Sequence, residues 1–411
     1  MVTTGNPAMT GALSGVTVLD LTQMMSGPFC TMMLADQGAD VIKIEPPTGE
    51  VARGYGPFLD DDEDRHYGGY FQSINRNKRS ISIDLKTEAG CAVFRRLVAD
   101  ADVVIENFRA GVMERLGLPY EDLAAINPRL VYATIRGFGD SRAGISPYQD
   151  WPAYDIVAQA MGGLMHMTGP EEGPPTKVGP GVGDTVTAMF TAFGVLAAVI
   201  QARESGKGQF VDVAMLDSIF ALCERAATFH GYDGSIAGAV GNHHPFFTPF
   251  GTYPCRDGWV AIGCPVDRFW TELARLMGDP EIGSDPRYAA NDERVARRQE
   301  VDAIVTNWTR DRTKAELADL IGGKVPFGPV NNIGDLADDP HLAARSMLAE
   351  LPHPGSERTV TVANTPIKLT GTPGGARRQA PTLGEDTDIV LRNAGYADDE
   401  IAAMREAGTV R

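Results

Sequence analysis

The stretch that decides the fold is VTVLDLTQMMSGPFCTMMLADQGADVIKIE, residues 16–45. Apolar alternation over residues 16–21 predicts a strand, and Gly27-Pro28 opens a helix. Residues 41–44 predict a second strand after that helix. This order predicts a βαβ unit, in which two parallel strands are joined by a helix that covers the sheet.

The rest of the first half repeats this alternation of strand and helix. Further strands are predicted at residues 80–84, 103–105 and 130–136, and an amphipathic helix lies between the first two. We therefore expect fold class α/β, with a large Rossmann-like domain built on an open, largely parallel sheet. Ligands of such sheets bind beyond the carboxyl ends of the strands.

The second half predicts a smaller domain inserted into the large one. The glycine-rich segment 231–245 is typical of a loop at a domain boundary, and Arg256-Asp257-Gly258 predicts a hairpin turn. Strand character returns at residues 359–363 and 366–369, before two amphipathic helices. We expect residues 1–230 to begin the large domain, residues 231–334 to form a smaller α+β domain, and residues 335–411 to complete the large domain.

The composition is typical of a globular protein and argues against several classes of function. The chain has 411 residues, of which 43% are hydrophobic and 22% charged. A formal net charge of −17 disfavours a nucleic-acid or anionic-membrane partner, because such partners require clustered cations. The five cysteines are scattered with no CxxC pair. We therefore expect no disulfide framework, no metal site and a reducing, cytoplasmic location.

No segment predicts a membrane span or a secretory signal. The first residues carry no cationic or apolar signal segment. The longest apolar run, residues 188–200, is too short to cross a bilayer. We expect this run to be a buried core helix.

Just before that run, the residues GPGVGD, 179–184, place a carboxylate where a glycine-rich loop turns into a helix. A dinucleotide-binding fingerprint requires a third glycine where Asp184 stands, so a nicotinamide oxidoreductase is disfavoured. The helix N-terminus and the glycine amides favour an anionic side chain, which makes Asp184 a candidate nucleophile. Aspartate is also a frequent N-cap, and the local sequence leaves both interpretations open.

Several short blocks are distributed along the chain: GVTVLDLT (15–22), SGP (26–28), GADVIKIE (38–45), NRNKRS (75–80), ENF (106–108), GD (183–184), GKGQ (206–209) and LGE (383–385). In this order and spacing, they resemble the family III CoA-transferases, the CaiB/BaiF-type group of formyl-CoA transferase and α-methylacyl-CoA racemase. The similarity spans nearly the whole chain. The order of the blocks, rather than any single tripeptide, makes the resemblance specific.

The resemblance implies that the chain transfers coenzyme A between carboxylic acids, with the family's nucleophilic aspartate at Asp184. A carboxylate there attacks the donor thioester to form a mixed anhydride, and the released CoA thiolate converts this anhydride into an aspartyl-CoA thioester. The acceptor carboxylate attacks that thioester, and CoA resolves the second anhydride as the product acyl-CoA. Coenzyme A is then a substrate, and no permanently bound cofactor is expected. The resemblance also implies that two chains interlock as a homodimer.

The resemblance places the CoA contacts as well. Arg76, Lys78 and Arg79 form the densest basic cluster of the first half, which suits either the phosphates of CoA or a solvated turn. Arg115 matches a basic CoA contact but equally suits a helix surface, and Phe108 equally suits the core. The implied CoA-binding residues are Met25, Ser26, Ile83, Asp84, Leu85, Lys86, Asn107, Phe108, Arg109, Arg115 and Tyr154.

Around the acyl group the resemblance is less complete. Formyl-CoA transferase has a glutamine where Met25 stands, and its glycine-rich lid has no obvious counterpart. Gly183, His243 and His244 are candidates for the substrate pocket, the histidines because an imidazole can bind a carboxylate. Loop histidines are also often structural or solvated. The donor and acceptor acids stay open, with a dicarboxylate such as succinate expected as donor by family habit alone.

Two alternative functions stay open. An α-methylacyl-CoA racemase exchanges an α-proton between a histidine and an aspartate, but the position of its histidine is Tyr154. The pKa of a tyrosine is too high for an unassisted base at neutral pH, so racemisation is disfavoured. A non-catalytic CoA-binding protein is the alternative of another class, and the intact Gly183-Asp184 pair argues against it.

Overall fold

The computed structural model describes residues 11–62, 65 and 67–411, and the chain packs as two compact units. The first unit holds the described residues of Met1–Leu164, Val178–Thr228 and Ala343–Arg411. The second unit holds Met165–Lys177 and Phe229–Leu342. The chain thus leaves the first unit and later returns to it. The segment Met165–Lys177, which the sequence assigns to the large domain, packs with the second unit.

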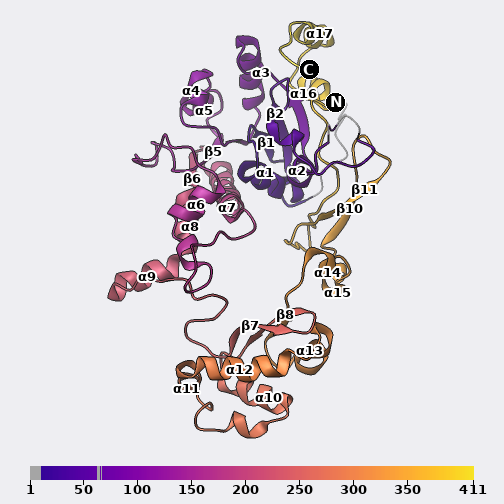
Figure 1. The fold of residues 1–411 in the computed structure, drawn as a ribbon. Helices are drawn as coiled ribbons and strands as arrows, with labels where there is room; N and C mark the ends of the chain where they lie inside the picture. The colour runs from indigo at the N-terminus through magenta and orange to yellow at the C-terminus, as the bar shows by residue number, and fades with distance from the viewer. Residues whose placement is uncertain (1–10, 63–64, 66) are drawn as a thin grey trace. The chain divides into compact units, whose positions relative to one another are not determined.

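A six-stranded parallel sheet is the centre of the first unit (Figure 1). Its strands lie in the order β3-β2-β1-β4-β5-β6, so the chain winds outward from β1 on one side and from β4 on the other. The predicted parallel sheet is therefore confirmed. The bounds are β1 (Thr17–Asp20), β2 (Asp40–Glu45), β3 (Arg79–Ser82), β4 (Val103–Glu106), β5 (Val131–Arg136) and β6 (Phe210–Ala214).

Both faces of this sheet are buried, because successive residues of a strand point to opposite faces and both sets are apolar. Leu19 belongs to the core beneath α3 (Glu88–Val98). The preceding residue, Val18, belongs to the opposite core, which is covered by α1 (Ser26–Asp36) and α7 (Val182–Ser205). The remaining helices of this unit are α2 (Gly69–Ile74), α4 (Val112–Arg115), α5 (Tyr120–Ile126), α6 (Asp155–Met161), α8 (Met215–Leu222), α16 (Thr387–Asn393) and α17 (Asp398–Glu406).

The helix α7 is longer than the apolar run that predicted it. It spans 24 residues and is, by length and composition alone, long and apolar enough to cross a membrane. Within the protein, however, Ala188, Ala192 and Val195 of α7 are buried in the core that α7 shares with α1 and β5. The prediction of a core helix is confirmed for this face, but the sequence argument from length was wrong. The other face exposes Phe193 and Ile200, which are 75% and 68% exposed.

The second unit is a three-stranded antiparallel sheet with helices. The predicted hairpin is confirmed: β7 (Phe250–Cys255) pairs antiparallel with β8 (Gly258–Gly263), which also pairs with β9 (Phe327–Pro329). Tyr253, Val260 and Trp270 belong to its core. The helices of this part are α10 (Asp267–Met277), α11 (Asn291–Ala296), α12 (Arg298–Thr309), α13 (Lys314–Ile321) and α14 (Ile333–Ala337). Two of the boundaries between the units fall within α9 (Glu224–Asp233) and α15 (Pro340–Ala344).

The returning segment forms a two-stranded hairpin of β10 (Leu348–Pro352) and β11 (Thr359–Ala363). The sequence predicted β11 but missed β10. The strand predicted at residues 366–369 was wrong, because this stretch has no regular structure. Pro366 lacks a backbone N–H donor, and Ile367 and Leu369 are partly exposed, so little favours pairing there.

One glycine sets how closely the α7–β6 connection approaches β5. A Cβ at Gly208 would lie 1.9 Å from the carbonyl oxygen of Leu130, so a side chain there must displace backbone. We expect Gly208→Ala to cost roughly 3 kcal/mol or more of unfolding free energy. At Gly206, which ends α7 with a φ of +75° and open space around its Cβ position, we expect alanine to cost about 1 kcal/mol. Thermal unfolding followed by circular dichroism compares the two, and equal losses would contradict the close-approach argument.

Candidate active site

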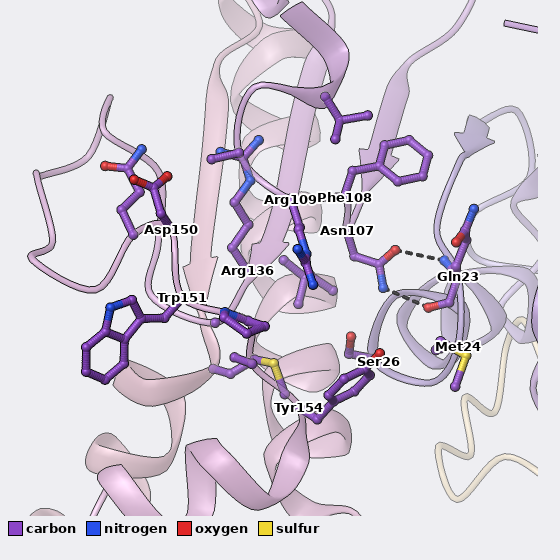
Figure 2. A pocket seen from close by; sticks show the side chains of 18 of the residues that line it. Gln23, Met24, Ser26, Asn107, Phe108, Arg109, Arg136, Asp150, Trp151 and Tyr154 are labelled. Atoms are coloured by element: carbon purple, nitrogen blue, oxygen red, sulfur yellow. Dashed lines mark hydrogen bonds between the residues drawn. The ribbon is translucent and has the colours of Figure 1, made fainter. Parts of the chain in front are cut away.

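A cavity of about 490 Å³ opens at the carboxyl ends of β1, β4 and β5 (Figure 2). At or just after the ends of these strands, the lining residues are Gln23, Met24, Ser26, residues 107–110, Arg136 and Gly137; residues 149–154, ahead of α6, also line it. The strands β1 and β4 are neighbours at the point where the winding of the sheet reverses. Ligands of open α/β sheets bind at such a point. We call this space the switch-point cavity.

The switch-point cavity brings together the predicted nucleophile and many of the predicted CoA contacts. They come from positions far apart in the sequence, and each follows a strand or begins a helix. The predicted residues that line the cavity are Ser26, Asn107, Phe108, Arg109, Arg115, Tyr154 and Asp184.

Asp184 lies in the first turn of α7, where the helix dipole attracts anionic groups. The N-cap residue of this helix is Gly181, so the interpretation of Asp184 as the N-cap was wrong. The backbone N–H of Gly183 donates to Asp155 Oδ1 at 2.8 Å. Asp155, the first residue of α6, therefore satisfies an amide of α7 from outside that helix. This contact was not predicted from the sequence, because no local pattern marks a hydrogen bond between two separate helices.

Two arginines of the cavity wall are not committed to acidic partners. Arg109 and Arg115 both line the switch-point cavity. Within residues 11–62, 65 and 67–411, neither side chain makes a hydrogen bond or ion pair. In a chain with a net charge of −17, such cations concentrate positive potential in one place. They suit an anionic ligand.

A third arginine, Arg136, has a structural partner instead. Its Nη2 donates to Glu106 Oε1 at 2.8 Å, and it also forms an ion pair with Asp140. Glu106 Oε2 in turn accepts a hydrogen bond of 2.6 Å from the backbone N–H of Phe108. The buried Glu106–Arg136 pair thus fixes the turn that presents Asn107 and Phe108 to the cavity. Glu106 belongs to the block ENF (106–108), but no role for it was predicted from the sequence.

Asn107 joins the loop after β4 to the loop after β1 (Figure 2). Its Oδ1 accepts a hydrogen bond from the Gln23 backbone N–H at 2.8 Å, and its Nδ2 donates to the Gln23 carbonyl oxygen at 2.7 Å. This amide side chain pairs with the Gln23 backbone N–H and C=O as a neighbouring strand would, and it holds the two walls of the cavity together. Its role as a CoA contact stays a prediction, but its structural role is clear.

A model of CoA-transferase family III matches residues 13–387 of the chain. The chain belongs to this family. The family predicted from the sequence blocks is therefore confirmed, and with it the α/β fold class and a transferase activity. The interlocking of two chains stays a prediction.

Curated relatives of this family III CoA-transferase cover almost its whole length. The succinyl-CoA:mesaconate CoA-transferase of Haloarcula hispanica is 45% identical over 388 residues, which are 94% of this chain and 97% of the relative. The succinyl-CoA–D-citramalate CoA-transferase of Chloroflexus aurantiacus is 36% identical and covers 96% of both chains. The formyl-CoA:oxalate CoA-transferase of Streptomyces avermitilis is 35% identical, over 98% of this chain and 100% of the relative.

Solved structures show the same fold. A CAIB/BAIF family protein from Brucella suis is 35% identical, with a TM-score of 0.84 over 94% of this chain and 100% of the other. The protein Rv3272 of M. tuberculosis is 30% identical, with a TM-score of 0.81 over 93% of this chain and 99% of the other.

Some residues predicted to bind CoA lie outside the switch-point cavity of this family III CoA-transferase. Met25 lines a second cavity of about 900 Å³, formed with α1, α2 and the returning segment. Ile83 is buried in the core and pairs with Val410. Leu85 packs against the same core, whereas Asp84 and Lys86 lie in the loop between β3 and α3. The roles of residues 83–86 and Met25 at CoA stay predictions.

The predicted acyl-pocket residues lie in different units. Gly183 is buried beside Asp155 in the first unit. His243 and His244 belong to the second unit. His243 Nδ1 lies 3.7 Å from Asp302 Oδ2, and the ring of His244 stacks on Phe247. Their contribution to substrate binding stays a prediction.

The basic cluster after α2 is neither a phosphate site nor a solvated turn. Arg76 pairs with Asp36, Lys78 with Asp20, and Arg79 with Asp40. All three cations are buried or nearly so. Both interpretations of the cluster were wrong, because the partner acids come from α1, β1 and β2, and the local sequence does not show them.

Glu106 makes the stability of this family III CoA-transferase depend on pH. Burial, opposed by Arg136, raises the pKa of Glu106 from 4.5 to about 7. Between pH 4.5 and about 7, Glu106 therefore stays protonated in the folded state but is ionised in the unfolded state. The free energy of unfolding falls across this range, and the contribution of Glu106 to it is lost as the pH rises through 7. We expect Glu106→Gln to remove about 3 kcal/mol of this pH dependence. Thermal unfolding between pH 4.5 and 8 measures it.

The exposed Glu204→Gln variant is the matched control and should follow the wild type at every pH. A Glu106→Gln variant whose melting temperature falls with pH as steeply as that of the wild type would rule out Glu106 as the group responsible.

Proposed function

We propose that this family III CoA-transferase moves CoA from an acyl-CoA donor to a carboxylic acid through covalent intermediates on Asp184. The observation that carries the proposal is that Asp184, Arg109 and Arg115 line one cavity at the switch point of the sheet. That cavity combines a carboxylate at a helix N-terminus with cations that lack acidic partners among the described residues.

In the proposed reaction, an Asp184 oxygen attacks the thioester carbonyl, and the C–S bond breaks to release CoA thiolate. The thiolate attacks the aspartyl carbonyl of the resulting anhydride, which forms an aspartyl-CoA thioester and releases the donor acid. The acceptor carboxylate then attacks the aspartyl thioester, and CoA attacks the acceptor carbonyl of the second anhydride. Asp184 is regenerated as a carboxylate. No redox change and no net loss of the thioester occurs.

The walls of the cavity suit the parts of CoA. Arg109 and Arg115 carry the charges that the pyrophosphate and the 3′-phosphate require. Phe108, held by the Glu106 turn, offers an aromatic face for the adenine ring. Amides at the start of α7 are the candidate donors for the oxyanion that develops when the thioester is attacked.

The names of the relatives favour a dicarboxylic donor. The relatives from Haloarcula hispanica and Chloroflexus aurantiacus are both named for succinyl-CoA, and that from Agrobacterium fabrum, 38% identical, for succinate and glutarate. We therefore propose succinyl-CoA or a similar short dicarboxylyl-CoA as donor and a small carboxylic acid as acceptor. No observation favours racemisation, because Asp155, beside Tyr154, is committed to the Gly183 amide and to Gln159.

We also propose a cytoplasmic homodimer. The single chain exposes many large apolar side chains on α7 and α8, which is unusual for a surface that faces only water. Each of them is at least 45% exposed: Met189, Phe190, Phe193, Ile200, Phe220 and Leu222. A second copy of the chain, as the family resemblance implies, provides apolar cover for them.

Asp184→Ala is expected to abolish transfer and to leave the Kd for CoA within about threefold of the wild type, because the side chain supplies the nucleophile rather than the phosphate contacts. Hydroxylamine trapping with succinyl-CoA, read by mass spectrometry, should label the peptide that contains residue 184 only in the wild type. The exposed Asp122→Ala variant is the control. Arg115→Gln should give the opposite split, with CoA binding weakened about tenfold or more.

Substantial transfer by Asp184→Ala would refute the assignment. If CoA binds but no acyl-CoA of a broad panel labels residue 184, a non-catalytic CoA-binding protein is the better interpretation. Exchange of deuterium at the α-carbon of a methyl-branched acyl-CoA, without CoA transfer, would indicate the racemase.

Phe193→Glu tests the homodimer. A charge on the exposed face of α7 is expected to weaken association, because an unpaired carboxylate is costly to bury in an apolar interface. Size-exclusion chromatography with light scattering should show the mass of two chains for the wild type and a larger share of single chains for the variant. Lys207→Glu, an exposed substitution on the loop after α7, is the control. A wild-type protein with the mass of one chain would contradict the proposal.

A further inference from the structure

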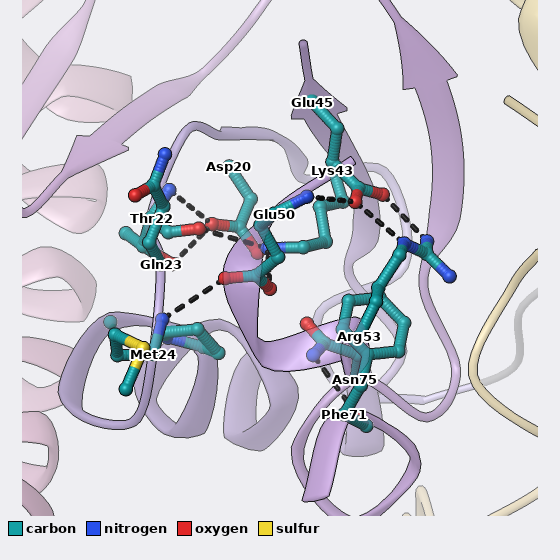
Figure 3. Close-up of polar contacts among 12 residues, drawn as sticks. Asp20, Thr22, Gln23, Met24, Lys43, Glu45, Glu50, Arg53, Phe71 and Asn75 are labelled. Carbon is teal, nitrogen blue, oxygen red and sulfur yellow. Dashed lines mark hydrogen bonds and ion pairs between the residues drawn. The ribbon is translucent and has the colours of Figure 1, made fainter. Parts of the chain in front are cut away.

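In the turn between β1 and α1, the backbone amides of residues 22–24 donate to side chains (Figure 3). The Thr22 backbone N–H donates to Asp20 Oδ1 at 2.9 Å, and the Thr22 carbonyl oxygen accepts from Lys43 Nζ at 2.8 Å. The next peptide is held by Asn107, as described above. The Met24 backbone N–H then donates to Glu50 Oε2 at 3.0 Å. The shape of this turn therefore depends on side chains of β1 and β2 and of the segments that follow β2 and β4.

The side chains that hold the turn are buried charges. Lys43 Nζ lies 2.9 Å from Glu50 Oε1, and their side chains are 0% and 1% exposed. Lys78 Nζ lies 2.9 Å from Asp20 Oδ2, and both side chains are 0% exposed. Removing two charges from water is costly, and an apolar pair of similar volume is often at least as stable. Stability alone is therefore a poor explanation for the Lys43–Glu50 pair.

Met24 shows what the pair holds. Its φ is +64°, in the left-handed region that side chains other than glycine rarely adopt. Such a conformation persists only where the surroundings impose it, and it is concentrated at functional sites. Gln23, Met24 and Ser26 all line the switch-point cavity, whereas Lys43 and Glu50 do not. The strained residue is in the cavity wall, and the buried pair lies behind it.

We infer that the Lys43–Glu50 ion pair is a positioning element of the transfer reaction. Glu50 fixes the Met24 amide and Lys43 fixes the Thr22 carbonyl, so together they hold Met24 left-handed and set the wall formed by Gln23, Met24 and Ser26. Neither residue lines the switch-point cavity, so both act through the turn. The effect on catalysis rests on the proposed function, but the effect on the turn does not.

The test replaces the pair as a unit, because a single substitution leaves an unpaired buried charge and endangers folding. The double variant Lys43→Met, Glu50→Leu keeps the volume and removes both contacts to the turn. We expect at least tenfold faster amide exchange at residues 22–24, measured by hydrogen–deuterium exchange without substrate, and at least a tenfold loss in kcat/KM for succinyl-CoA. The melting temperature should stay within a few degrees of the wild type.

A glycine background separates positioning from general damage. Glycine adopts a positive φ without the steric cost that methionine has, so a Met24→Gly variant does not need the Lys43–Glu50 pair to hold this conformation. When the Lys43→Met, Glu50→Leu substitutions are added to Met24→Gly, kcat/KM should fall by less than threefold relative to Met24→Gly alone. The matched control is Arg79→Gln, Asp40→Asn, which removes an ion pair of the same sheet that makes no contact with the turn. It should leave amide exchange at residues 22–24 unchanged.

Unchanged exchange at residues 22–24 in the double variant would overturn the inference. An equal loss in kcat/KM with methionine or glycine at position 24 would also overturn it, because the pair would then act through something other than the strained turn. If exchange rises as expected and glycine removes the difference, but Asp184→Ala still transfers CoA, the positioning stands and the proposed nucleophile fails.

Discussion

The buried charges beneath the carboxyl end of β1 are the constraint on which the rest of the first unit depends. Asp20 pairs with Lys78, and Lys43 pairs with Glu50, so β1, β2, β3 and the turn into α1 are tied together at one point. Lys78 also donates to Asn75 Oδ1 at 2.7 Å, so its ammonium group is well satisfied. Burial nevertheless lowers the pKa of Lys78 to about 8, while the neighbouring cations hold the pKa of Asp20 well below its usual range. Each ion pair is stable only with both of its partners, since one missing partner leaves an isolated charge in the core.

Much of the fold was predictable because its signals are local. Val18 and Leu19 are both apolar, and only a strand buried on both faces requires that. The hairpin around Asp257 and the helix that contains Asp184 are likewise marked by their own residues. The basic cluster shows the limit of this reasoning: its cations pair with Asp20, Asp36 and Asp40, which lie earlier in the chain and are brought beside it by the tertiary fold.

The candidate site was predictable in its main members and not in its supports. Asp184 and Asn107 were found because they lie within blocks that resemble a known family, and Arg115 because it matches a basic CoA contact of that family; the structure brings all three to one cavity. The contacts of Asp155 with Gly183 and of Glu106 with Phe108 carry no such mark. Two adjacent methionines line different cavities: Met24 lines the switch-point cavity, and Met25 lines the other one. The left-handed backbone conformation of Met24 turns the two side chains apart. Residue type gave no way to choose between two adjacent methionines.

The helix α7 serves three purposes along a single rigid rod. Its first turn carries Asp184, one side is buried with α1, and the opposite side exposes Phe193 and Ile200. A helix with a packed side cannot rotate about its axis without opening voids in the core. A molecule that covers the outer side of α7 therefore contacts the same helix that carries the Asp184 carboxylate. A substitution on the outer side that shifts α7 also shifts Asp184 in its first turn. The exposed residues of this helix should therefore vary less among relatives than their exposure alone suggests.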